Sequence, residues 1–77
     1  MRLYCIYDKV AQEGGPLFEA KNDTVALRIV SGISLPSPRE DYKVFCVGEY
    51  SHDPVKLTAL KEITEVLDVS KEVEDDA

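Results

Sequence analysis

The fold is decided by two short runs of sequence, LYCIYD at residues 3–8 and YKVFCVGEY at residues 42–50. Both runs are rich in β-branched and aromatic residues, which is typical of strands in a pleated, buried sheet. Apolar side chains occupy both alternating faces of each run. A chain of 77 residues has too little material to cover both faces of a sheet by itself. We therefore expect one sheet face to meet a second copy of the chain, another partner, or stacked bases.

Length and composition are typical of one small globular domain. Apolar residues make up 44% and charged residues 31% of the chain, which is ordinary for such proteins. No stretch approaches the roughly 18 apolar residues of a membrane span. The sequence runs from Met1 straight into a strand, without the apolar segment of a secretory signal. We expect neither a membrane-spanning segment nor a signal sequence.

The candidates for redox or metal chemistry are Cys5, Cys46 and His52. An oxidising compartment would allow a bridge between the cysteines, but without a signal sequence we expect reduced, buried thiols. Two cysteines and one histidine are too few ligands for a metal site. The adjacent Ser51-His52-Asp53 is not a catalytic triad, because triad members converge from separated positions. We expect no metal, no cofactor and no small-molecule substrate.

The net charge of −6 is placed unevenly. Asp68 and residues 71–77 carry most of the excess, and the end at 71–77 is expected to be a disordered acidic tail. The body of the chain, at residues 1–70, is expected to fold as a single domain close to neutrality. Strong non-specific binding to phosphates requires clustered lysine and arginine, so the body gives it little support.

The first half of the chain predicts two strands and a helix. A strand at residues 3–8 is followed by a polar connection at 9–15, where Gly14-Gly15-Pro16 is a turn signal. Residues 17–20 then form a second, antiparallel strand. A helix begins at Asn22-Asp23-Thr24, whose side chains suit an N-terminal cap, and ends at Gly32. One face of this helix is apolar: Val25, Ile29 and Ile33 recur every four residues, with Ala26 and Val30 beside them.

The second half of the chain predicts the same order again. A proline-containing loop at residues 34–41 precedes a strand at 42–50, and a turn at 51–54 leads to a strand at 55–59. Apolar residues at helical spacing predict a short second helix over residues 60–69. The fold class is therefore α+β, in the order ββαββα, with a four-stranded, mostly antiparallel sheet and both helices on one face. The other face would carry Tyr4, Ile6, Phe45 and Val47, or their alternates.

Three stretches carry a family resemblance: LYCIYD at residues 3–8, PLFEAKNDTVALR at 16–28 and EDYKVFCVGEY at 40–50. In this order and spacing they resemble the small non-structural protein of gokushoviruses, which are single-stranded DNA bacteriophages of the Microviridae. The likeness covers about residues 1–60. It implies a role in viral genome synthesis, assigned in that family by genome position and analogy and not by a motif. It also implies residence in the host bacterial cytoplasm.

Several residues are candidates for contact with nucleic acid or a protein partner, and each also has a plainer structural interpretation. Aromatic side chains favour a platform for stacked bases, or equally a core or dimer interface. Asn22 is also a helix cap, and Arg28 is also a solvated residue or a local ion-pair partner. Asp8 and Glu49 end the two leading strands, but no nucleophile accompanies these carboxylates, so we expect no catalysis. The predicted contact residues are Tyr4, Lys21, Asn22, Arg28, Lys43 and Phe45.

Two functions remain open at this point. The first is a non-enzymatic phage accessory protein for genome replication and single-stranded DNA synthesis, acting as a homodimer on DNA or on the phage replication initiator. The second is an acidic protein-binding module that modulates a host factor. The family setting favours the first, and the negative charge, which is repelled by phosphates, favours the second.

Overall fold

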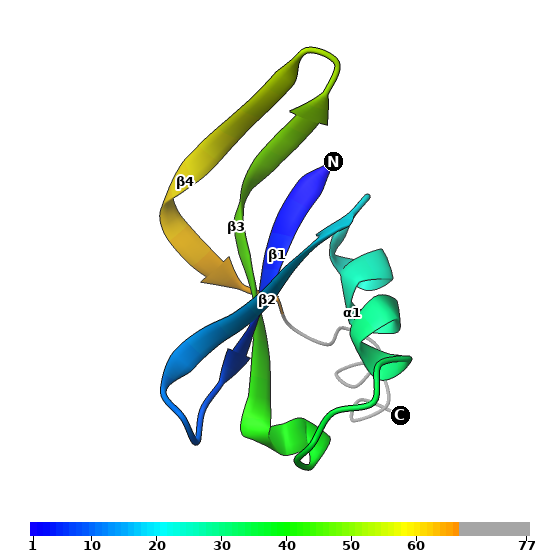
Figure 1. Cartoon of the computed structure of the whole chain (residues 1–77), viewed down its shortest axis with the longest axis vertical. Helices are drawn as coiled ribbons and strands as arrows, with labels where there is room; N and C mark the ends of the chain where they lie inside the picture. Colours follow the sequence, from blue (N-terminus) through cyan, green and yellow to red (C-terminus); the bar gives the residue numbers. More distant parts are fainter. Residues whose placement is uncertain (67–77) are drawn as a thin grey trace, which may run out of the picture.

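The structure is a computed structural model that describes residues 1–66. Four antiparallel strands form one sheet in the order β2-β1-β3-β4, and one helix accompanies them in the described part of the chain (Figure 1). The predicted α+β class is therefore confirmed. The elements are β1 (Arg2–Asp8), β2 (Glu13–Ala20), α1 (Asp23–Ser31), a 3-10 turn (Arg39–Asp41), β3 (Tyr42–His52) and β4 (Val55–Glu65).

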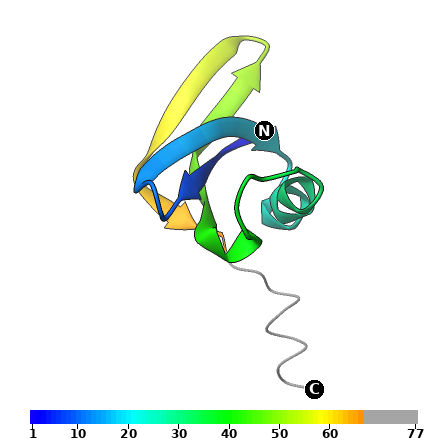
Figure 2. The ribbon, with the colours of Figure 1, turned by 60° about the horizontal axis from the view of Figure 1, so that its bottom comes forward.

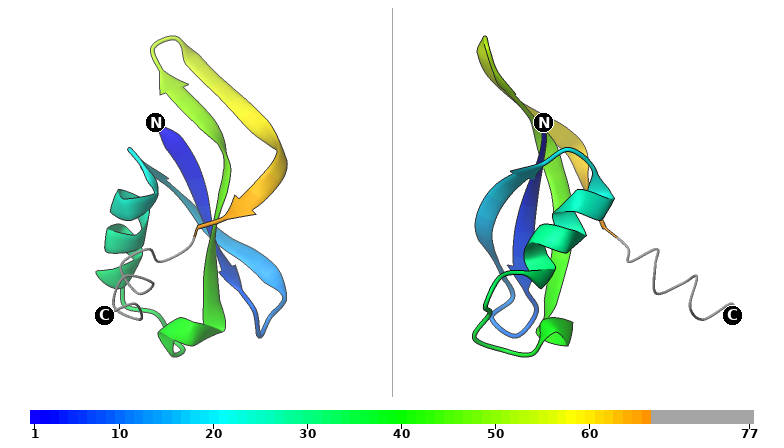
Figure 3. Two further views of the ribbon diagram at one scale, coloured as in Figure 1. Left: turned by 180° about the vertical axis from the view of Figure 1, so that it is seen from behind. Right: turned by 90° about the vertical axis from the view of Figure 1, so that its right-hand side faces the viewer.

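The helix covers only one face of the sheet, as the two turned views show (Figures 2 and 3). Because one face is covered, buried and half-buried residues alternate along the central strands β1 and β3. On the side of α1, Tyr4 and Ile6 of β1 are buried, as are Val44 and Cys46 of β3. Their sequence neighbours point to the opposite face and are only half-buried. We call this opposite side the open face; its central residues are Leu3, Cys5, Tyr7, Phe45 and Val47.

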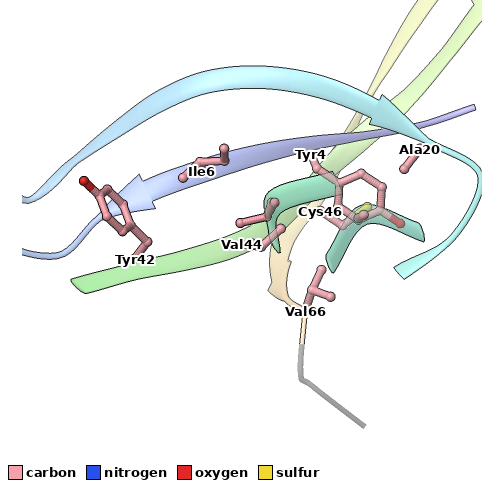
Figure 4. Packing of buried hydrophobic residues seen from close by; sticks show 9 residues of the cluster. Tyr4, Ile6, Ala20, Tyr42, Val44, Cys46 and Val66 are labelled. Atoms are coloured by element: carbon pink, nitrogen blue, oxygen red, sulfur yellow. The ribbon is translucent and has the colours of Figure 1, made fainter. Parts of the chain in front are cut away.

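The core lies between α1 and the sheet (Figure 4). Ala26 and Val30 of α1 pack there, because they lie four residues apart on the apolar side of the helix. The cluster of buried residues consists of Tyr4, Ile6, Ala20, Ala26, Val30, Tyr42, Val44, Cys46 and Val66.

Both predicted ends of the helix are confirmed. The side chain of Asn22 accepts a hydrogen bond of 2.9 Å from the backbone N–H of Val25, which satisfies one of the free donors of the first turn. At the other end, the N–H of Gly32 reaches the carbonyl oxygens of Arg28 and Ile29 at 3.3 and 3.1 Å.

The predicted second helix at residues 60–69 is wrong over its described part, which continues β4 to Glu65. Thr64 pairs with Cys46, and the N–H of Val66 donates to the carbonyl of Val44 at 2.8 Å. A strand here satisfies the backbone groups along β3, which a helix would leave without partners. The order is thus ββαββ up to residue 66, and the predicted second helix on the face of α1 is absent from these residues.

The turn predicted at Gly14-Gly15-Pro16 is also wrong, because β2 already begins at Glu13. The chain reverses at residues 9–12 instead. There the Asp8 carboxylate accepts hydrogen bonds from the N–H groups of Val10 and Ala11 at 2.9 and 3.0 Å. The following Gln12 takes a left-handed φ of 58°. The polar side chain of Asp8 therefore makes the turn that the glycine pair was expected to make.

Both cysteines are free thiols, and they lie on opposite faces of the sheet. Cys5 pairs with Phe45 and points to the open face, whereas Cys46 is buried on the side of α1. A bridge between them is excluded by this geometry. The end of the domain at residue 70 and the tail at 71–77 lie outside the described residues. Within residues 1–66, no helix is long and apolar enough to cross a membrane.

Candidate functional site

The open face is the side of β1 and β3 that α1 does not cover. Its central residues on β1 and β3 are only half-buried. Exposed apolar side chains extend this surface on both edge strands: Leu17 of β2 is 60% exposed, and Val55 and Leu57 of β4 are 77% and 64% exposed. The register places these three on the same face as Cys5 and Tyr50.

Aromatic rings gather in two pairs on the open face. Tyr7 of β1 and Phe45 of β3 meet edge to face, with ring centroids 5.6 Å apart. Farther along β3, Tyr50 and His52 meet in the same way at 4.8 Å. Edge-to-face packing fixes the rings against each other while parts of them stay accessible. The open face therefore offers rigid aromatic surface from its middle to the tip of the β3–β4 hairpin.

The charged groups on the open face are largely paired. The Lys43 ammonium lies 3.2 Å from the Glu65 carboxylate, and both side chains are about 40% exposed, at 41% and 40%. His52 Nε2 lies 2.6 Å from Glu19 Oε1. The Lys43–Glu65 ion pair, between neighbouring strands, reduces the positive potential that would attract phosphates. The surface is thus aromatic and nearly neutral.

Of the six predicted contact residues, Tyr4 is removed from the surface by the fold. Its side chain is completely buried on the side of α1, and its hydroxyl donates a hydrogen bond of 2.7 Å to Asp23. Burial, together with this hydrogen bond, raises the pKa of Tyr4 above its ordinary value. Arg2 lies 3.4 Å from the same carboxylate and 5.8 Å from the Tyr4 ring. These contacts fasten the start of α1 to β1.

Three further predicted residues belong to the helix segment and not to the open face. Asn22 is the cap, Lys21 precedes it as an exposed residue, and Arg28 is exposed in the last turn. The structure therefore brings together only Lys43 and Phe45 on the open face, where they follow one another with the intervening Val44 turned into the core.

Sequence reasoning left Tyr7, Tyr50 and His52 out of its contact residues. The available signal was the period-2 alternation, which places Tyr7 opposite in facing to Tyr4. It could not reveal that Tyr7 meets Phe45, because that contact requires the register between β1 and β3.

The register of β1 and β3 also separates the two carboxylates considered for catalysis, Asp8 and Glu49. Asp8 pairs with Tyr42, at the far end of β1 from the Arg2–Glu49 pair. Among residues 1–66 no group of acidic, histidine or cysteine side chains could hold a metal ion.

Comparison with known proteins gives one finding. A family model described as Phage ORF5 protein matches residues 1–72. Neither the curated proteins nor the solved structures give a significant match.

Proposed function

The chain belongs to the Phage ORF5 protein family, and on this premise we propose that it is a non-enzymatic accessory protein of phage genome replication. The phage is a single-stranded DNA phage of the gokushovirus kind, and the protein works as a homodimer in the cytoplasm of the host bacterium. Its open face is the contact surface, on which unpaired bases of single-stranded DNA stack. The observation that carries this proposal is the accessible Tyr7–Phe45 pair at the centre of the open face.

Stacking on aromatic rings suits single-stranded DNA, because every base has a π-face and no sequence-specific contact is required. Each stacked base contributes about 1–3 kcal/mol in proteins of this type. Tyr7 and Phe45 lie on neighbouring central strands, so their position is fixed by backbone pairing on both sides. A platform built on rigid strands holds its rings ready for a base without a further ordering cost.

Electrostatics contributes little to this contact. Lys43 is the cross-strand neighbour of Tyr7 in the Tyr7–Phe45 platform, and its ion pair with Glu65 already neutralises it. The binding constant of a protein that neutralises few phosphates falls only slowly with salt: the logarithm of the constant decreases by about 1–2 for each unit increase in the logarithm of the salt concentration. We therefore expect weak binding that depends more on ring contact than on salt.

Replacing Phe45 by alanine should weaken binding of a labelled oligo(dT) roughly tenfold, because one stacking surface is lost. Fluorescence anisotropy at low salt measures the affinity, and Tyr7→Ala should have a similar effect. Val10→Ala is the matched control: Val10 is 74% exposed and apolar, but it lies in the turn at residues 9–12, away from the platform. Wild-type protein that binds no oligonucleotide at low salt would rule out the DNA contact.

A second function is favoured by the overall charge of −6 and by the pairing of Lys43 with Glu65. In this case the open face is an apolar surface of an acidic module that binds a host protein. This function predicts no affinity for oligonucleotides and retention of a host protein by immobilised wild-type chain. Phe45→Ala should lose that protein and Val10→Ala should keep it; equal retention by both would contradict this function. Light scattering tests the homodimer separately.

A further inference from the structure

A cavity of about 410 Å³ lies on the side of α1, away from the open face. Most of its lining residues come from the start of β2 and from the segment that follows the helix. Its size is within the range of natural ligand pockets. Its apolar walls are made by Ile6, Phe18, Ile33, Leu35, Pro36 and Tyr42.

Tyr42, one of the residues that line this cavity, has a buried hydroxyl without a partner among residues 1–66. Tyr42 is only 7% exposed, and its hydroxyl has no hydrogen-bond partner among residues 1–66. Figure 4 shows its ring at the opposite end of the core from Tyr4, with the oxygen turned toward the end of the β1–β2 hairpin. A buried hydroxyl without a partner costs free energy, and most such groups in proteins are satisfied. The Tyr42 hydroxyl is therefore a hydrogen-bonding group that a bound molecule can satisfy.

The charged groups that line the cavity are both acidic. Glu13 is exposed, and Asp8 is half-buried at the end of β1. The hydrogen bonds of Asp8 to the turn use Oδ1, and no bond involves its Oδ2 in the described part of the chain. Among residues 1–66, no lysine or arginine lines the cavity. The cavity thus combines an apolar interior, one inner hydroxyl and a negative rim.

We propose that this cavity binds an aromatic side chain with a polar tip, presented by a basic segment of a protein partner. The ring fills the apolar interior, its polar tip pairs with the Tyr42 hydroxyl, and flanking lysine or arginine side chains meet Asp8 and Glu13. Single-stranded DNA has the wrong charge for this rim. The end of the chain itself, residues 67–77, also has the wrong charge, since it contains one lysine and five acidic residues. The site is independent of the open face and of the function proposed above.

Titration of the full isotope-labelled chain by NMR tests the chemistry of the cavity with small probes. Tyramine has a phenol ring and a positive end, and 3-(4-hydroxyphenyl)propionate has the same ring and a negative end. Tyramine should shift the amide signals of Gly14, Gly15 and Leu35 and bind at least about fivefold more tightly than the propionate. Equal affinities, or shifts confined to other residues, would overturn the proposal.

The source of the ligand is tested with tripeptides. Acetylated and amidated Lys-Tyr-Lys should bind more tightly than tyramine, and Glu-Tyr-Glu should not bind. Binding of tyramine without binding of Lys-Tyr-Lys would assign the cavity to free amines and overturn the partner segment. Shifts of the same amides by oligo(dT) would overturn it too.

Three variants distinguish the contribution of the acidic rim to binding from that of the Tyr42 hydroxyl. Glu13→Lys should weaken Lys-Tyr-Lys binding at least about fivefold, whereas Glu40→Lys, which changes the net charge equally at an exposed site outside the cavity, should leave it unchanged. Tyr42→Phe should abolish the preference for tyramine over phenethylamine, which lacks the phenol hydroxyl. An equal loss in both lysine variants, or an unchanged preference in Tyr42→Phe, would contradict the site.

Discussion

Replacing Gly48 by alanine should destabilise the protein by about 3 kcal/mol, because the new methyl group has no room. A Cβ at this position would lie 2.5 Å from the carbonyl oxygen of Thr58 and 3.4 Å from the Cα of Ala59, both of which are backbone atoms of β4. The chain can relieve this overlap only by moving β4 away from β3. Urea unfolding followed by circular dichroism measures the change in the free energy of unfolding.

Gly32→Ala is the matched control for this substitution. Gly32 ends α1 with an ordinary φ of −88°, and a Cβ there would lie 3.6 Å from the nearest carbonyl oxygen, in normal contact. We expect a change within about 0.5 kcal/mol. A Gly48→Ala variant as stable as Gly32→Ala would show that β3 and β4 are not as close at this point as the structure has them.

Removing the hydroxyl of Tyr4 should cost about 1.5 kcal/mol of stability, because the hydrogen bond of 2.7 Å to Asp23 is lost. Tyr42→Phe makes the same chemical change at a second buried tyrosine, whose hydroxyl has no partner among the described residues. That substitution should be neutral or stabilising by up to about 1 kcal/mol, because a desolvation cost disappears. Urea unfolding of both variants gives the comparison. Equal losses at both positions would contradict the different roles of the two hydroxyls.

The Tyr4 hydroxyl also predicts a dependence of stability on pH. Burial raises the pKa of Tyr4 in the folded state above its ordinary value of 10.0. The folded state therefore favours the protonated phenol, and the stabilisation is complete below pH 10 and is lost as the pH rises above it. The urea midpoint of the wild-type protein should fall more steeply above pH 10 than that of Tyr4→Phe. Parallel profiles for the two proteins would show that Tyr4 titrates normally.

Local sequence signals predicted the elements whose causes are local. The cap at Asn22 and the end at Gly32 bound α1 because side-chain and backbone groups of neighbouring residues satisfy the helix ends. The runs at residues 3–8 and 42–50 are strands because their side chains suit a pleated buried surface. The helix predicted from the apolar spacing of residues 60–65 is wrong, because these residues belong to β4. Residues 60–63 lie opposite Val47, where the register of β3 and β4 shifts, and this irregular pairing allows a helix-like spacing in a strand.

The candidate site was predicted less well than the fold. Alternation shows that Tyr4 and Tyr7 point to opposite faces, but it does not show which face the helix covers. Alternation alone therefore predicts Tyr4 as a surface contact, whereas the fold buries it completely. Lys43 and Phe45 lie on the open face. The ion pair of Lys43 with Glu65 joins residues on different strands, so it requires the pairing of β3 with β4.

Local sequence properties and chain length alone predict the strand segments, the helix with its cap, and the shortage of residues for covering two sheet faces. These properties depend on backbone preferences and on the number of side chains, which are fixed before any long-range contact forms. Three features follow only from the folded structure: β4 pairs with β3 up to Glu65, α1 covers one face of the sheet, and Tyr42 lines a cavity, with no partner for its hydroxyl among residues 1–66. Each of these depends on hydrogen bonds and packing between segments far apart in the chain, and no local pattern records them.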